Sequence, residues 1–144
     1  MMRIPTGIHL IVLFGISGCA LSLTDPLDRR GAFKQTQTKF TQYVRWGKFE
    51  QAGRFVDPEL REEFMSYAPT FSDLRFSEYE ITRVDIKDGV KSASVDVRIT
   101  AYRLSMPFER SVDLTEEWTR DDATGVWTVK VDIRKLHDTL SGVP

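Results

Sequence analysis

The chain has 144 residues, a length typical of one domain. Hydrophobic residues make up 41% of it and charged residues 28%, which is enough apolar side chain to build a core and excludes a chain that stays disordered. The formal net charge of -1 argues against nucleic acid as the main partner, because phosphate backbones are bound through a concentrated positive field.

The N-terminal segment has the features of a secretory signal peptide. Arg3 provides a small basic start, and the run that follows over residues 8–16 is nearly all apolar. This run is much shorter than the roughly 20 apolar residues that a membrane-spanning helix needs. We therefore expect the core of a signal peptide that is removed, rather than a permanent membrane span.

The chain has one cysteine, Cys19, which follows this run in the sequence Ile16-Ser17-Gly18-Cys19. The segment resembles a bacterial lipobox, with Ile16 in place of the more common leucine. The resemblance implies that signal peptidase II cleaves before Cys19, that the thiol carries a diacylglyceryl group and that the new amine is acylated, for example with palmitate. Two or more such chains anchor a protein stably, since each buried methylene contributes about 0.8 kcal/mol. The alternative is an incidental thiol in an uncleaved segment.

These signals divide the N-terminal part into a lipoprotein signal peptide over residues 1–18 and an acylated cysteine with a short tether over residues 19–25. Ala20 follows the cysteine, at the position where enterobacterial-type lipoproteins that stay in the inner membrane commonly have aspartate. The resemblance therefore implies a lipid-anchored protein of the bacterial cell envelope, in the outer membrane and facing the periplasm.

Three helices are expected in the first half of the mature chain. Asp25-Pro26 predicts the start of the first, with aspartate as N-cap and proline at the first helical position, and Trp46-Gly47 predicts its end. A short second helix follows over residues 49–56. Asp57-Pro58 repeats the start signal for a third helix, which Pro69 ends. The aromatic residues that recur at helical spacing are expected to lie in the core.

From Phe76 the apolar period changes to two, which predicts four long antiparallel strands. Asp88-Gly89 predicts a two-residue hairpin turn in which Lys87 pairs with Val90. The apolar residues of the first strand change phase along its length. One extra residue near Thr82-Arg83, a β-bulge, restores a single apolar face and bends the sheet.

One register places the apolar residues of the strands on the same face. It pairs Ile99 with Val112, Val97 with Leu114, Arg103 with Phe108, and Trp118 with Trp127, on a fourth strand that reaches Ile133. The other face is charged and pairs Arg98 with Asp113 and Asp113 with Asp132. Because the cores of stable interfaces are depleted in charge, we expect this face to be solvated and the domain to be a monomer.

The expected fold class is therefore α+β, with N-terminal helices packed on a curved four-stranded antiparallel sheet. This order and the closing pattern E-E-W-T-R-D-D-A-T-G-V-W-T-V-K-V resemble the NTF2-like (cystatin-like cone) superfamily over about residues 26–133. The last residues, 134–144, are expected to form a C-terminal tail, either a frayed helix end or disordered.

The resemblance implies a ligand pocket between sheet and helices, and the candidates to line it are Tyr43, Arg110, Glu116 and Trp118. Enzymes of this superfamily use a carboxylate base and a hydroxyl or acid that stabilises an enolate. The candidates for this chemistry are Glu116 as the base, Tyr43 as the hydrogen-bond donor and, as a weaker candidate for the acid, Asp57. Each candidate also has a structural interpretation: Tyr43 in the core, Asp57 as an N-cap, Glu116 as a hydrogen-bonded or rim carboxylate, and Arg110 extending its charge to solvent.

The sequence contains no phosphate-binding glycine loop, nucleophile elbow or zinc-ligand spacing, so no metal or cofactor is expected. Two functions stay open. The preferred one is a membrane-anchored lipoprotein whose non-catalytic domain binds a small apolar ligand or a partner protein. The alternative is a small pocket enzyme of the isomerase or dehydratase type that uses Glu116 and Tyr43. A filled interior favours the first, and an open cavity where Glu116 meets a hydroxyl favours the second.

Overall fold

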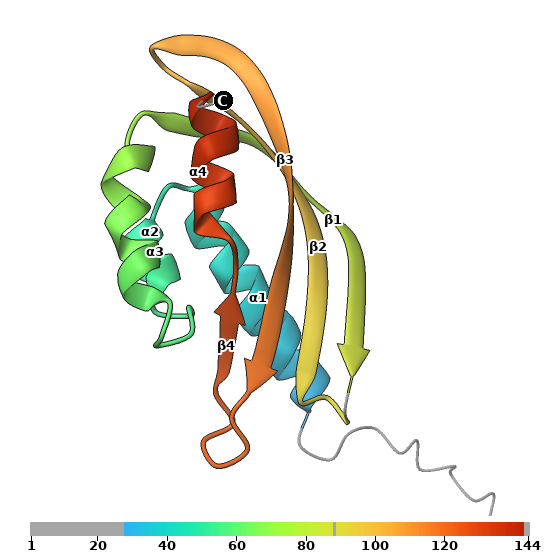
Figure 1. Ribbon diagram of the computed structural model, residues 1–144. Coiled ribbons are helices and arrows are strands. Elements are labelled where there is room, and N and C mark those ends of the chain that lie inside the picture. The colour runs from blue at the N-terminus through green and yellow to red at the C-terminus, as the bar shows by residue number, and fades with distance from the viewer. Residues whose placement is uncertain (1–27, 88, 143–144) are drawn as a thin grey trace, which may run out of the picture.

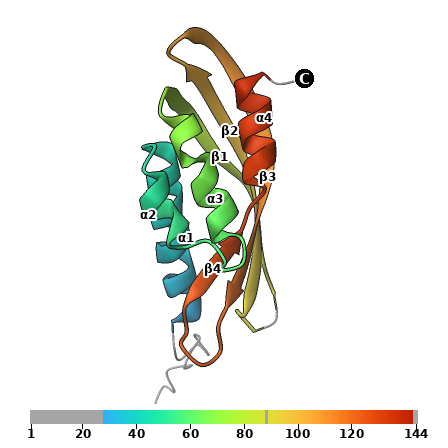
Figure 2. The same cartoon turned by 60° about the vertical axis from the view of Figure 1, so that its left-hand side comes forward.

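The computed structural model describes residues 28–87 and 89–142, so Cys19 and the predicted signal peptide lie outside the described residues. Four antiparallel strands form one sheet in the order β1-β2-β3-β4, and helices cover its concave face (Figures 1 and 2). The elements are α1 (Arg29–Arg45), α2 (Phe49–Gly53), α3 (Arg61–Tyr67), a 3-10 turn (Ala68–Phe71), β1 (Leu74–Lys87), β2 (Ser92–Arg103), β3 (Met106–Arg120), β4 (Trp127–Lys130) and α4 (Ile133–Ser141). The predicted α+β class is confirmed.

The first helix begins later than predicted and ends as predicted. Asp28 is its N-cap, since the side chain accepts a hydrogen bond from the Gly31 N–H at 3.3 Å and the helix starts at the next residue. The predicted start at Asp25-Pro26 is therefore too early, and those two residues lie outside the described part. Gly47 follows the helix in the left-handed region, with φ 68°, which is a common way for a helix to stop.

The third helix also begins later than the predicted start at Asp57-Pro58. Residues 55–57 are held against β4 instead, where Val56 forms a parallel bridge with Val129 and the Asp57 N–H donates to the Val129 carbonyl at 2.9 Å. The chain then needs a turn before α3 can start at Arg61. The α-helix ends at Tyr67, two residues before Pro69, and the chain continues as the 3-10 turn, in which Ala68 keeps a right-handed helical backbone.

The predicted bulge in β1 is confirmed. Pairing with β2 skips Thr82, between Ile81 and Arg83, and a second skip at Ser77 was not predicted. Each extra residue bends the strand and changes which side chains face inward. Between the two bulges, Tyr79 pairs with Ile99 on the concave face, where the helices lie.

The central register is confirmed, but three pairings near the turns are wrong. Lys87 pairs with Ser92 rather than Val90, Arg103 with Met106 rather than Phe108, and Trp118 with Val129 rather than Trp127. Every difference is two residues, so the side chains keep their predicted faces, because strand side chains alternate with a period of two. At the first turn the cause is a longer connection, with Val90 in the left-handed region at φ 66°.

The chain after β4 is helical rather than extended. Asp132 caps α4 by accepting a hydrogen bond from the Lys135 N–H at 2.8 Å, so the predicted pairing of Asp113 with Asp132 is wrong. The segment 134–144, predicted as a tail, contributes most of this helix instead. Leu136 and Leu140 are buried, and α4 lies on the same side of the sheet as the other helices (Figure 1).

The β2–β3 hairpin extends past the helices at one end of the molecule (Figure 1). Phe108, predicted among the apolar core positions, lies there and is 73% exposed, together with exposed Leu104 and Met106. The prediction fails because the concave face has no covering helix at this point. None of the described helices is long and apolar enough to span a membrane.

The convex face of the sheet carries the charged and hydroxyl side chains that the sequence predicted. Arg98 and Asp113 form an exposed ion pair at 2.8 Å, and Thr115 donates to Asp96 at 2.7 Å. Exposed pairs of this kind contribute little in water. We therefore expect residues 20–144 to sediment as a monomer at tens of micromolar. A dimer mass that persists in raised salt would contradict a solvated convex face.

Candidate functional site

Glu116 is the one charged side chain that is buried among the described residues, at 1% exposure. It lies in the middle of β3 and points into the concave side of the sheet, opposite Val95, as the register predicted. Burying a carboxyl group is costly unless other groups bond to it. Glu116 and the side chains that bond to it therefore form the candidate site.

Three side chains donate hydrogen bonds to this carboxyl group. The Tyr79 hydroxyl donates to Oε1, the Trp118 indole N–H donates to Oε2 at 3.0 Å, and Nε2 of Gln37 donates to Oε2 at 3.4 Å. The same Gln37 nitrogen donates to the Thr41 hydroxyl at 2.9 Å. One buried carboxyl group thus connects helix α1 to strands β1 and β3.

The surroundings favour the protonated forms of both acidic groups. Burial raises the pKa of Glu116, and the hydrogen bonds from Tyr79, Trp118 and Gln37 oppose this rise. Burial also raises the pKa of Tyr79, and the neighbouring Glu116 charge and hydrogen bond raise it further. The phenol therefore keeps its proton and acts as the donor of the pair.

The space beside this pair is nearly filled. The remaining cavity has a volume of about 10 Å³, roughly the space needed by one water molecule. Phe40 and Phe64 close it from the N-terminal helices, and Ile133 and Leu136 close it from α4. A carboxyl group with a raised pKa beside a hydroxyl has the groups that proton transfer needs, but no substrate fits next to them in this conformation.

Of the other predicted pocket residues, only Trp118 belongs to this network. Tyr43 is half-buried, and its ring lies 6.0 Å from that of Phe55. The described structure brings the Tyr79 hydroxyl, and not that of Tyr43, to Glu116.

Two further candidates lie apart from the network. The Asp57 side chain accepts a hydrogen bond from the Glu59 N–H at 3.0 Å and lies 3.8 Å from the Lys130 ammonium group. Arg110 is exposed, and its guanidinium group lies against Gly142 at the end of α4. Cys19 lies outside the described residues.

Sequence reasoning missed Tyr79, Gln37 and Thr41, although the pattern contained a signal for two of them. Gln37 interrupts an apolar helical stripe at a position that faces the core, and a polar residue there indicates a buried hydrogen-bond network. Tyr79 lies just before the predicted bulge, which places this part of β1 with its apolar side chains on the concave face. Thr41 carries no comparable signal.

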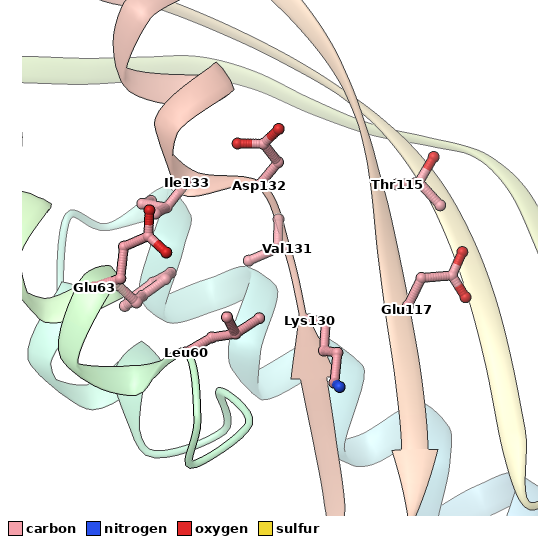
Figure 3. Close-up of a pocket in the computed structure, with 9 residues that line it drawn as sticks. Leu60, Glu63, Thr115, Glu117, Lys130, Val131, Asp132 and Ile133 are labelled. Atoms are coloured by element: carbon pink, nitrogen blue, oxygen red, sulfur yellow. The ribbon is translucent and has the colours of Figure 1, made fainter.

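A second hollow, of about 370 Å³, lies on the surface between α3, strand β3 and the segment that leads from β4 to α4 (Figure 3). Leu60, Val131 and Ile133 contribute apolar side chains, and charged Glu63, Glu117, Lys130 and Asp132 surround them. The charges have mixed sign, and Glu63 is paired with Arg134 at 3.0 Å. No group of side chains in the described part of the chain has the composition to hold a metal ion.

The fold and the site together define an α+β domain whose helices close a curved sheet around a buried carboxyl group. A solved structure similar to it is that of a SEC-C motif containing protein from Rhodopseudomonas palustris, at 15% identity over 67% of this chain and 74% of that one, with a TM-score of 0.54.

Two other solved structures are similar at lower scores. One is a LEH-like epoxide hydrolase from Mycobacterium tuberculosis, at 13% identity over 75% of this chain and 88% of that one, with a TM-score of 0.48. The other is a protein of unknown function with a cystatin-like fold from Nostoc punctiforme, at 15% identity over 74% of this chain and 92% of that one, with a TM-score of 0.46. No protein-family model and no curated protein matches the sequence. At these identities the similarity concerns the fold and not the activity.

Proposed function

We propose that the chain is a lipid-anchored protein of the bacterial envelope whose domain binds a partner protein through its surface and does not catalyse a reaction. The filled interior carries this proposal. Small-molecule sites usually offer about 300 Å³ or more, and the space beside Glu116 is about 10 Å³. This difference supports surface binding over the binding of a small apolar ligand inside the sheet.

The anchor rests on the lipobox at Cys19, outside the described residues. Helix α1 enters the domain beside the β1–β2 turn, where the Arg29 guanidinium donates to the Gly89 carbonyl at 3.3 Å. An extended chain from Cys19 to Asp28 spans at most about 30 Å, at up to about 3.6 Å per residue. We infer that the acyl chains hold this end of the domain close to the membrane, facing the periplasm.

The contact between Tyr79 and Glu116 favours a second candidate function. In this candidate the domain is a small pocket enzyme of the isomerase or dehydratase type, with Glu116 as base and Tyr79, in place of Tyr43, as donor. It requires the interior to open, for example by displacement of α4. Saturable uptake of the apolar dye N-phenyl-1-naphthylamine by the folded protein would favour this candidate, and we expect none.

The test of the proposed function uses the full chain in a bacterial envelope, with a photo-reactive amino acid at Trp46 or at Phe108. We expect the normal chain to lose residues 1–18, leaving 126 of the 144 residues, and to partition into detergent. Cys19→Ala should stay in the aqueous phase or remain an uncleaved precursor. Irradiation should crosslink the normal chain to one specific second protein.

Two results would contradict the proposal separately. A Cys19→Ala chain that is still processed and still partitions into detergent would refute the anchor. If no exposed position gives an adduct with another protein, partner binding is refuted.

A further inference from the structure

A groove of about 390 Å³ lies where the α1–α2 turn approaches the start of β1. Its apolar lining consists of Trp46, Phe71, Leu74 and Phe76, and two arginines, Arg45 and Arg75, also line it. Trp46 is 72% exposed, so a large aromatic side chain remains in water beside a hollow whose lining is partly apolar and partly polar. Exposed aromatic side chains next to a hollow are typical of binding surfaces rather than of a fully solvated face.

Positive charge is concentrated at this groove. Arg45 and Arg75 line it, and the Lys48 ammonium group lies 5.7 Å from the centroid of the Trp46 ring. No carboxyl group is among the lining residues. None of the three cations forms an ion pair with another described residue, whereas Arg98 and Arg103 are each paired with an aspartate. A groove that combines an aromatic wall with unpaired cations is complementary to a ligand with both apolar and acidic groups.

The position of the groove favours a protein segment over a lipid surface. Helix α1 enters beside the β1–β2 turn, and the groove lies at the other end of the helix, about 25 Å away at 1.5 Å per residue. The groove therefore lies away from the end of the domain that Cys19 would tether. A hollow between two elements also fits a chain segment better than a flat membrane.

The neighbouring strand can provide main-chain hydrogen bonds to such a segment. β1 is one of the two edge strands of the described sheet and has a strand partner on one side only. Residues 74–76 of this strand form one wall of the groove. An extended peptide can add to an edge strand while its alternate side chains enter a neighbouring pocket.

We propose that this groove binds an extended acidic segment of the partner protein. An aromatic or aliphatic side chain of the segment packs against Trp46 and Phe76, and its carboxylates pair with Arg45 and Arg75. The inference rests on the proposed function, because it names the surface and the chemistry by which the partner is recognised.

The test uses the acylated chain on phosphatidylcholine vesicles and three fluorescein-labelled peptides of eight residues. The first alternates Asp or Glu with Phe or Leu, the second replaces its acids by lysine, and the third replaces its apolar residues by serine. We expect saturable anisotropy with the first peptide, weakening as salt is raised, and binding at least about tenfold weaker with the other two.

Matched charge reversals locate the site. Arg75→Glu and Arg45→Glu should each weaken binding of the first peptide about tenfold or more. Arg83→Glu makes the same charge change on an exposed residue near the other end of β1 and should leave binding unchanged. Trp46→Ala should also weaken binding, while the thermal midpoint stays close to that of the normal chain because the side chain is exposed.

Several outcomes would overturn the groove proposal. They are equal binding of the acidic and basic peptides, an equal effect of Arg83→Glu and Arg75→Glu, and no binding of the first peptide. If the vesicles that carry the chain cluster with phosphatidylglycerol vesicles, and Arg75→Glu abolishes this clustering, the groove binds lipid instead. Photo-adducts from Phe108 with none from Trp46 would refute the groove and leave the proposed function standing, whereas no adducts from any position would refute the function itself.

Discussion

Replacement of Trp118 by alanine is expected to destabilise the domain by about 3–5 kcal/mol, the range for removal of a large buried aromatic side chain. The side chain is 1% exposed, and its ring packs edge-on against Phe33 and Phe40 at centroid distances of 5.9 and 5.6 Å. Its indole N–H also donates to Glu116. For a domain of this size the thermal midpoint should fall by about 10–20 °C, measured by calorimetry or circular dichroism.

Trp127 provides a matched control for the hydrogen bond. It is also buried, and its ring lies 4.9 Å from Phe33, but its indole nitrogen has no hydrogen-bond partner in the described part of the chain. Trp127→Phe should therefore be mild, whereas Trp118→Phe should cost about 1–3 kcal/mol more because Glu116 loses a donor. Equal losses in the two phenylalanine variants would contradict this assignment, and unchanged stability in both alanine variants would contradict the packing of β3 and β4.

Glu116→Gln is expected to change how the free energy of unfolding depends on pH. Burial holds the pKa of Glu116 above its ordinary value of 4.5, so the folded protein keeps a proton that the unfolded chain has released. The stability that this proton provides is fully present below the unfolded pKa and is lost as pH rises through the folded pKa. Between about pH 4.5 and neutrality, the normal domain should therefore lose stability relative to Glu116→Gln, as denaturant unfolding can measure.

Tyr79→Phe gives a second measurement of the same effect. The hydrogen bond from Tyr79 lowers the pKa of Glu116, so its removal should raise that pKa further and extend the loss of stability to higher pH, while the pH at which the loss begins stays the same. Tyr43→Phe is the control, because Tyr43 makes no hydrogen bond to this carboxyl group in the described structure, and it should leave the pH profile unchanged. Parallel pH profiles for the normal domain and Glu116→Gln would show that the carboxyl group does not titrate in the folded state as expected.

The faces of the strands could be predicted from the sequence, but the exact pairings at their ends could not. A two-residue alternation decides whether Val97 or Arg98 faces the core, and a shift of two residues leaves that decision unchanged. The pairings depend on turn conformation. Val90, a β-branched residue, adopts a left-handed φ that no propensity predicts, and this changes the length of the first hairpin connection.

The buried carboxyl group was predictable, whereas most of what surrounds it depends on long-range packing. The register alone places Glu116 in the interior. The approach of Tyr79 depends on the curvature that two bulges give to β1, and only one of them left a signal in the sequence. Helix α4 was missed because Val129, Val131 and Ile133 alternate as in a strand, and the N-cap at Asp132 was the competing signal that prevailed.

The link between α1 and β3 has a consequence for how the protein is made. Gln37 and Glu116, which meet in the interior, are separated by 79 positions in the chain. Phe33 packs against Trp118 and Trp127, which are also synthesised much later. The apolar side chains of α1, Phe33, Phe40 and Val44, are therefore made long before the strands that cover them. These side chains are open to chaperones for most of synthesis. A topology of this kind delays closure of the core until the C-terminal strands have been synthesised.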